Sequence, residues 1–320
     1  MRRSISFTIL FFMMLSVLVS CYQSHKRELD LAYTLAESKP DSALAFLNRI
    51  NQAKLSDEDM AKYALTYYMA QDKSGLDVDN DSLIRIAYDW YGEHQDDSLY
   101  ASSLYYMGKC FLLNDSMEQA RACLEKSYSI SDSLHNMNVK CLALDKLIEV
   151  EEQLAPYKAL NYAKTLVRLY DSMPNVTIYN KVAARLRLCD NYMFVDSLGL
   201  ALCEGKIALH FAIVSTDRGL YSFVCQDLAN VYEKMGEKDS CLFYAQQSYR
   251  LKNADRFSSQ LMLASAYISV DSIKQAFTIL KHATPKTAEE CYSVFYMRSQ
   301  AAMKAQDYKT AKTFSDSACC

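Results

Sequence analysis

The chain has 320 residues, a formal net charge of −3, and only 7 Gly and 4 Pro. Average usage would give roughly 22 Gly and 16 Pro, so the shortage argues against β-sandwiches, propellers and Gly-rich nucleotide-binding sheets, which need these residues in their turns. The charge gives no electrostatic reason to expect a nucleic acid as partner. We therefore predict an all-α protein.

The first twenty residues have the pattern of a leader. Arg2 and Arg3 precede an almost unbroken apolar run over residues 5–19, and an abruptly polar stretch begins at Gln23. The run is shorter than the about 20 apolar residues that a membrane-spanning helix needs. A basic start followed by a short apolar segment is typical of secretory signals. No other segment approaches 18 consecutive apolar residues.

The end of this leader carries a further pattern, Leu18-Val19-Ser20-Cys21. It resembles the lipobox of bacterial lipoprotein precursors, whose cysteine is acylated before cleavage. The resemblance implies a signal peptide over 1–20, lipidation of Cys21 and a short tether over 21–26. Acyl chains contribute roughly 0.8 kcal/mol per buried CH₂, so we expect the chain to be membrane-anchored by lipid in the cell envelope, on the periplasmic side. An uncleaved anchor and an ordinary secretory leader are the alternatives.

Residues 27–320 contain a recurring unit of two helices joined by a short polar turn. In the clearest copy, over 98–130, Gly108 and Phe111 mark the first helix, Asp115 the turn and Ala120 the second helix. Small residues of the second helices recur at steps of 39, 42, 40, 35 and 35 residues, at Ala120, Ala159, Ala201, Cys241, Ala276 and Ala311.

This unit resembles the tetratricopeptide repeat (TPR). The small residue and aromatic of the first helix are matched by Gly108/Phe111, Ala229/Tyr232 and Ala264/Tyr267. Small side chains let two helices approach closely, and stacked hairpins bury the faces that one hairpin leaves exposed. The resemblance implies an α-solenoid of about eight stacked hairpins over 27–320.

Ten Asp-Ser pairs are spread along the chain, and we predict that those before second helices cap the helix N-termini with their side chains. Nine of the ten are followed by Ala, Leu, Met or Ile, which resembles the O-glycosylation site of exported Bacteroidetes proteins; glycosylation stays an open alternative. The six pairs before a second helix start at Asp41, Asp81, Asp115, Asp196, Asp239 and Asp271.

In the repeat family the first helices line a concave, protein-binding face. Some members grip a peptide carboxylate with a Lys/Asn/Arg clamp. Here Gln226 and Asn230 occupy two of those positions, but the next helix offers Ser258 and Met262 and no basic partner. We therefore expect an envelope protein or peptide segment as partner, bound at exposed inner-face residues: Tyr105, Lys109, Leu144, Ile148, Leu186, Asp190, Gln226, Asn230, Leu261, Tyr296 and Gln300.

We expect neither catalysis, nor a metal, nor a small-molecule cofactor. The sequence has no nucleophile constellation, phosphate-binding glycine loop or CxxC motif, and its five histidines are scattered. Cys141, Cys189, Cys225, Cys241 and Cys291 fall in helical apolar patterns, where a thiol packs as a small hydrophobe.

Two functions remain open. In the first, the chain is a membrane-tethered scaffold for proteins of the cell envelope. In the second, it is the ligand-sensing periplasmic half of a transmembrane regulator, because its Pro40-to-Leu44 and Lys62-to-Ile84 segments look like exported Bacteroidetes repeat proteins that continue into a spanning helix. Since this sequence stops at Cys320, the second alternative requires a truncated member.

Overall fold

The computed structural model describes residues 26–76, 80–94, 96–251 and 256–318, and these are helical with no β-strand. The predicted leader, Cys21 and most of the tether lie outside the described residues, as do Cys319 and Cys320. The described part contains sixteen α-helices, as many as the eight predicted hairpins require. The prediction of an all-α repeat array is confirmed.

The chain divides into two compact units, residues 1–153 and 154–320. Unit 1 contains a helix over 26–36, the 3₁₀ turn η1 (Gln52–Lys54), and the helices α2 (Pro40–Leu47), α3 (Asp57–Lys73), α4 (Ser82–Glu93), α5 (Asp97–Leu113), α6 (Met117–Ser133) and α7 (Met137–Leu154), which ends at the boundary. Unit 2 contains α8 (Pro156–Ser172), α9 (Ile178–Phe194), α10 (Leu198–Ser215), α11 (Arg218–Lys234), α12 (Lys238–Arg250), α13 (Arg256–Ser269), α14 (Ile273–Lys281), α15 (Ala288–Lys304) and α16 (Tyr308–Ala318).

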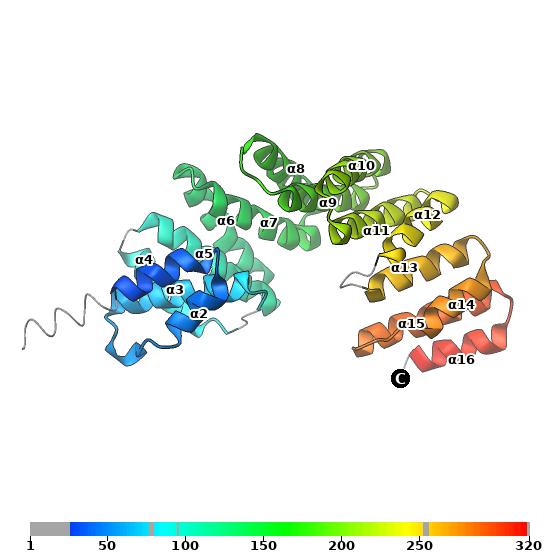
Figure 1. Cartoon of the computed structure of the whole chain (residues 1–320), viewed down its shortest axis with the longest axis horizontal. Coiled ribbons are helices and arrows are strands. Elements are labelled where there is room, and N and C mark those ends of the chain that lie inside the picture. Colours follow the sequence, from blue (N-terminus) through cyan, green and yellow to red (C-terminus); the bar gives the residue numbers. More distant parts are fainter. Residues whose placement is uncertain (1–25, 77–79, 95, 252–255, 319–320) are drawn as a thin grey trace, which may run out of the picture. The chain divides into compact units, whose positions relative to one another are not determined.

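Within each unit, consecutive helices form antiparallel hairpins, as α5/α6, α11/α12 and α15/α16 do (Figure 1). We use the term first helices for the helix that opens each hairpin. They are the helix over 26–36 and α3, α5, α7, α9, α11, α13 and α15. First helices of neighbouring hairpins also contact one another, namely α3 with α5, α9 with α11, α11 with α13, and α13 with α15. Each unit therefore has one side that is built from first helices.

Small residues sit where the helices of a hairpin cross. The small residues predicted for the second helices α6, α10, α12 and α14 (Ala120, Ala201, Cys241 and Ala276) are all at most 1% exposed. At Gly108 in α5, a Cβ atom would lie 2.7 Å from Cγ of Leu124, which is fully buried in α6. The crossing leaves no room for a side chain there, as the repeat pattern predicts.

The Asp-Ser pairs act differently from the prediction. Asp115, Asp196 and Asp271 are in the left-handed region, with φ between 55° and 59°. After α5, the Ser116 N–H donates to the carbonyl of Phe111 (2.8 Å), which closes a Schellman turn around Asp115. These aspartates therefore end the first helix, because a short turn needs one left-handed residue and Asp tolerates that conformation.

The capping prediction is wrong for all six pairs. Ser116, Ser197 and Ser272 are N-cap residues without a side-chain hydrogen bond to the helix, and so is Asp81. Asp41 and Asp239 lie inside the first turns of α2 and α12. Side-chain capping occurs instead at residues outside these pairs: at the N-termini of the first helices by Ser56, Asp96, Thr177, Asp217 and Thr287, and at α16 by Asp307.

Two apolar features of the sequence are explained by packing. Among the described helices, α10 alone has the length and apolar composition that could cross a membrane, with a mean hydropathy of 1.5 over 18 residues. It packs between α9 and α11 and buries Ala201, Gly205, Ala208 and Ala212 there. The thiols of Cys141, Cys189, Cys225 and Cys241 are buried free thiols, and that of Cys291 is half-buried.

The crossing of α5 and α6 can be tested with two Gly→Ala substitutions. Gly108→Ala forces a methyl group against Leu124, so we expect a loss of about 1–3 kcal/mol in the free energy of unfolding. Gly199→Ala in α10 meets no atom within 4 Å and removes a helical glycine, so we expect a gain of about 0.5–1 kcal/mol. Urea unfolding followed by circular dichroism measures both, and a stabilising Gly108→Ala would contradict the tight crossing.

Candidate functional site

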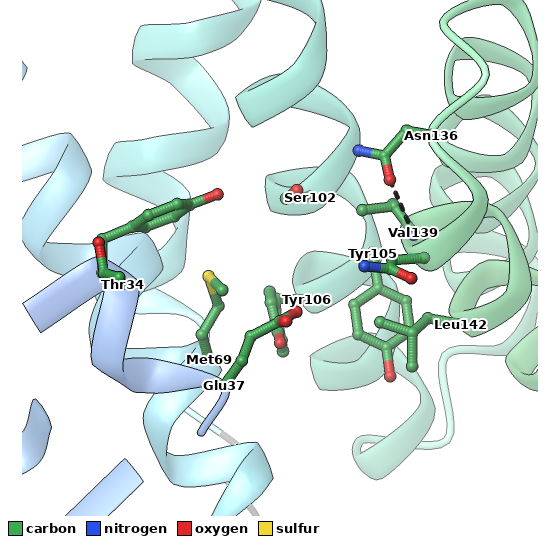
Figure 2. A pocket seen from close by; sticks show the side chains of 11 residues that line it. Thr34, Glu37, Met69, Ser102, Tyr105, Tyr106, Asn136, Val139 and Leu142 are labelled. Carbon is green, nitrogen blue, oxygen red and sulfur yellow. Dashed lines mark hydrogen bonds between the residues drawn. The ribbon is translucent and has the colours of Figure 1, made fainter. Parts of the chain in front are cut away.

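A cavity of about 370 Å³ opens in unit 1, on the side built from first helices. All four first helices of this unit, or the residues next to them, contribute to it. Figure 2 shows Glu37, Met69 and Tyr106 on one side of it and Asn136, Val139 and Leu142 on the other. Its lining residues are Tyr33, Thr34, Glu37, Met69, Ser102, Tyr105, Tyr106, Asn136, Asn138, Val139 and Leu142.

The cavity has a buried floor and an accessible rim. Met69, Ser102, Tyr105 and Tyr106 form the floor, and each is at most 8% exposed. The other lining residues are half-buried or exposed. A ligand in the cavity would therefore place an apolar group against aromatic rings and a thioether, while its polar groups stay at the rim.

The floor is held rigidly by packing from α3 and α5. The rings of Tyr105 and Tyr106 meet edge to face at 4.8 Å, and the ring of Tyr68 lies 6.4 Å from that of Tyr106. Lys109 of α5 forms an ion pair with Asp72 of α3. Both side chains are less than 20% exposed. Burial, followed by the charge of Asp72, raises the pKa of Tyr106 well above its usual value, so its hydroxyl is neutral.

One edge of the rim is shaped by the turn before α7. His135 takes a left-handed conformation there, with φ 55°, and Asn136 follows. The Asn136 Oδ1 accepts a hydrogen bond from the backbone N–H of Val139 at 3.3 Å. This contact fixes the start of α7 and leaves the amide nitrogen of Asn136 on the cavity side (Figure 2).

Three of the eleven predicted inner-face residues are buried, so the expectation that they are exposed is wrong. Leu144 and Ile148 are fully buried and Tyr105 is 3% exposed. The reason is that α7 buries a wide stripe, which also contains Ala143 and Leu147, and not one narrow face. Tyr105 still lines the cavity, whereas Lys109 is engaged by Asp72.

The other predicted residues lie on the first helices of unit 2. Tyr296 and Gln300 of α15 are exposed, and the ring of Tyr296 stacks on that of Tyr292 at 6.2 Å. Because α9, α11, α13 and α15 contact one another in series, these residues share one side of the unit. Their role in binding stays a prediction. The remaining ones, all half-buried, are Leu186, Asp190, Gln226, Asn230 and Leu261.

The sequence analysis found only Tyr105 of the eleven cavity residues. The others lie in or just after the helix over 26–36 (Tyr33, Thr34 and Glu37), in α3 (Met69), in α5 (Ser102 and Tyr106), and at or after the start of α7 (Asn136, Asn138, Val139 and Leu142). The eight tyrosines of residues 63–106 were the available signal, but their presence does not tell a packing ring from a cavity-lining ring.

Two carboxylates on the first helices of unit 2 influence each other. Burial raises the pKa of Asp227 in α11, and the neighbouring carboxylate of Asp190 in α9 raises it further. Burial and the same two carboxylates raise the pKa of the Cys189 thiol. Asp227 is therefore easier to protonate than an ordinary aspartate.

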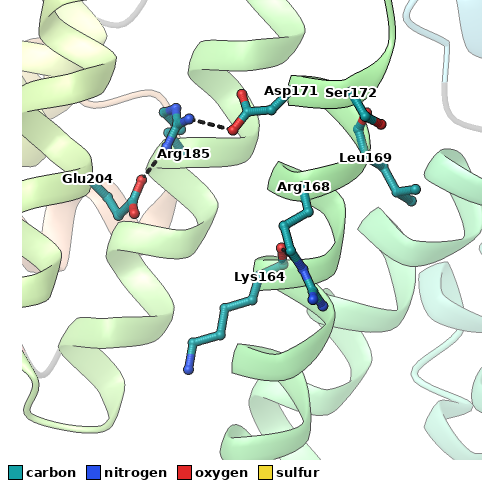
Figure 3. Close-up of polar contacts among 7 residues, drawn as sticks. All are labelled: Lys164, Arg168, Leu169, Asp171, Ser172, Arg185 and Glu204. Carbon is teal, nitrogen blue, oxygen red and sulfur yellow. Dashed lines mark hydrogen bonds and ion pairs between the residues drawn. The ribbon is translucent and has the colours of Figure 1, made fainter.

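A second group of charges, in α8, α9 and α10, is structural. The Arg185 guanidinium donates to Asp171 at 2.7 Å and to Glu204 at 2.6 Å, so one side chain joins three helices (Figure 3). Lys164 and Arg168 turn away from it, and Arg168 donates hydrogen bonds to Lys164 and Thr165 of its own helix. No group of three or more His, Cys, Asp or Glu that could hold a metal occurs among the described residues.

No known family and no curated protein matches the chain, but solved structures do. It is similar to the apo form of RapI, with a TM-score of 0.72 and 11% identity over 92% of this chain and 85% of that chain. The chain is also similar to aspartyl phosphate phosphatase F from Bacillus subtilis, with a TM-score of 0.60 and 11% identity over 92% of this chain and 83% of that chain.

A third match is the signal transduction ATPase with a tetratricopeptide repeat sensor from Pyrococcus horikoshii, with a TM-score of 0.68 and 11% identity. The match covers 91% of this chain but 46% of that protein. At these identities the likeness shows the fold alone. The fold is that of the TPR-like helical repeat proteins.

The raised pKa of Asp227, caused by burial and then by the Asp190 carboxylate, predicts a pH-dependent stability. A raised pKa means that folded Asp227 binds its proton more tightly than the unfolded chain does, so its contribution is present at low pH and is lost as pH rises above the usual Asp pKa of about 3.9. We expect Asp227→Asn to raise the free energy of unfolding at pH 8 by about 1–2 kcal/mol more than at pH 4. Asp239→Asn, an exposed aspartate of α12, is the control. Equal pH profiles for wild type and Asp227→Asn in urea unfolding would contradict this electrostatic effect.

Proposed function

We propose that this protein is a membrane-tethered scaffold of the cell envelope that binds a segment of a partner protein in the unit 1 cavity. The observation that carries the proposal is the cavity itself, with a buried aromatic floor on the side where four first helices meet. Clefts of about 300–1,000 Å³ with an apolar lining and a few polar groups are the usual form of a binding site.

The rim has the chemistry to hold a peptide backbone. Asn136 and Asn138 supply amide groups, which both donate and accept hydrogen bonds, and Thr34 and Tyr33 supply hydroxyl groups. Val139 and Leu142 add half-buried apolar surface beside the amides. A protein segment offers a side chain for the floor and backbone N–H and C=O groups for the rim, so it fits both parts of the cavity.

The lining favours binding over catalysis. Its ionisable side chains are one carboxylate, Glu37, and three tyrosines, and it contains no His, Cys, Lys or Arg. Such a set supplies neither an activated nucleophile nor a base paired with an orienting group. We assign the site no catalytic residue.

The membrane tether rests on Cys21, and it can be tested directly. In cells that express the full chain and are fed an alkyne fatty acid, we expect the wild-type protein to incorporate the label and Cys21→Ala to lose it completely, because lipobox acylation needs that thiol. Cys203→Ala, which removes an exposed thiol of α10, should keep the label. Label retained by Cys21→Ala would refute the tether.

The partner can be sought by crosslinking in intact cells, followed by purification of the tagged full-length protein. Val139→Arg places a long side chain over the cavity, so we expect recovery of the partner to fall at least tenfold. Leu134→Arg changes an exposed aliphatic residue at the end of α6 and should leave recovery unchanged. Circular dichroism checks that both variants are folded.

Two outcomes would redirect this proposal. A partner that is lost with Tyr296→Glu but retained with Val139→Arg would move the binding site to unit 2. Recovery of a small molecule and no protein would support the sensor alternative over the scaffold.

A further inference from the structure

The charge of the unit 1 cavity determines which kind of protein segment it can bind. Glu37 is its only charged lining residue, and the Glu37 carboxylate is exposed at the rim. Among the described residues no ion pair or hydrogen bond of this side chain is found. Figure 2 shows this side chain extending from the end of the helix over 26–36 toward the centre of the cavity, beside Tyr106.

Two cations on the helices that line the cavity, Lys62 and Lys109, are engaged by other carboxylates. Lys62 lies over the ring of Tyr33 at 5.6 Å and forms an ion pair with Asp30. Lys109, behind the floor, forms an ion pair with Asp72. Each of these cations is matched by a carboxylate of its own, so neither neutralises Glu37.

The charge of Glu37 raises the pKa values of the tyrosines around it. Burial raises the pKa of Tyr33, and the Glu37 carboxylate raises it further, followed by Asp96. Tyr106 also experiences Glu37, after burial, Asp72 and Tyr105. A negative field therefore extends from the rim to the floor. Aromatic rings such as these attract cations to their π-faces.

These features point to one kind of occupant. We infer that the cavity accepts a basic side chain, Lys or Arg, of the bound protein segment, with the aliphatic stem against Met69 and Tyr106 and the charged head beside Glu37. Lys and Arg are suited to this arrangement because their stems pack on apolar surface while their heads reach the polar edge. An acidic side chain or a terminal carboxylate is repelled by the same field. This inference rests on the proposed function.

The test uses blocked tripeptides, acetyl-Ala-Xaa-Ala-amide, with Lys, Arg, norleucine or Glu at Xaa. Norleucine keeps an aliphatic stem without the charge. With the full-length protein in a non-ionic detergent, saturation-transfer NMR titrations should give Lys or Arg an affinity at least tenfold higher than norleucine, and Glu no measurable binding. Glu37→Gln should reduce the preference for Lys over norleucine to below about threefold. Glu93→Gln, which removes an exposed carboxylate at the end of α4, should leave it unchanged.

The possible results separate this inference from the scaffold proposal. Equal affinity for Lys and norleucine, or a Lys preference that survives Glu37→Gln, overturns the inference while a protein segment can still occupy the cavity. Absence of binding by every tripeptide also overturns it. The scaffold proposal is judged separately, by whether Val139→Arg loses the crosslinked partner.

Discussion

The structure depends on the close approach of the two helices within each hairpin. Gly108 lies against Leu124 with no space for a Cβ atom, and Ala201, Cys241 and Ala276 are buried at the other crossings. A larger residue at any of these positions would push the helices apart and open the core on both sides, because interiors are close-packed and relax only in part. Close crossings keep each hairpin thin enough to stack on the next, which is how short helices share one continuous core.

Stacking of thin hairpins also creates the cavity. The first helices α3 and α5 contact each other, and side chains from residues 33 to 142 line one cavity in unit 1. The floor is firm because its tyrosines pack on one another and because the Lys109–Asp72 pair joins α3 to α5. The Lys109–Asp72 pair thus stabilises the array, whereas the Glu37 carboxylate extends toward the cavity.

In the turns, Asp ends the first helix of a hairpin and does not cap the second one as predicted. Asp and Ser are strong N-cap residues, so pairs before a second helix predict caps. In the hairpins of this protein the connection is so short that one residue must be left-handed to end the first helix, and Asp115, Asp196 and Asp271 take that conformation. The geometry of the turn outweighs the capping preference, and the following serine remains at the N-cap position without a side-chain bond.

The sequence by itself determined the helical class, the hairpin repeat and the small residues at the crossings, because these follow from local composition and from spacing along a single helix pair. Only the tertiary structure decided which side chains meet in the cavity. Tyr33, Met69, Tyr106 and Asn136 lie on four different segments, and their convergence depends on how much each hairpin rotates against the next. A fixed repeat register places Leu144 and Ile148 on the exposed face, but α7 buries a wide stripe that includes both. Repeat spacing fixes contacts within a hairpin, whereas the packing of many side chains between hairpins sets their rotation, and no local pattern encodes it.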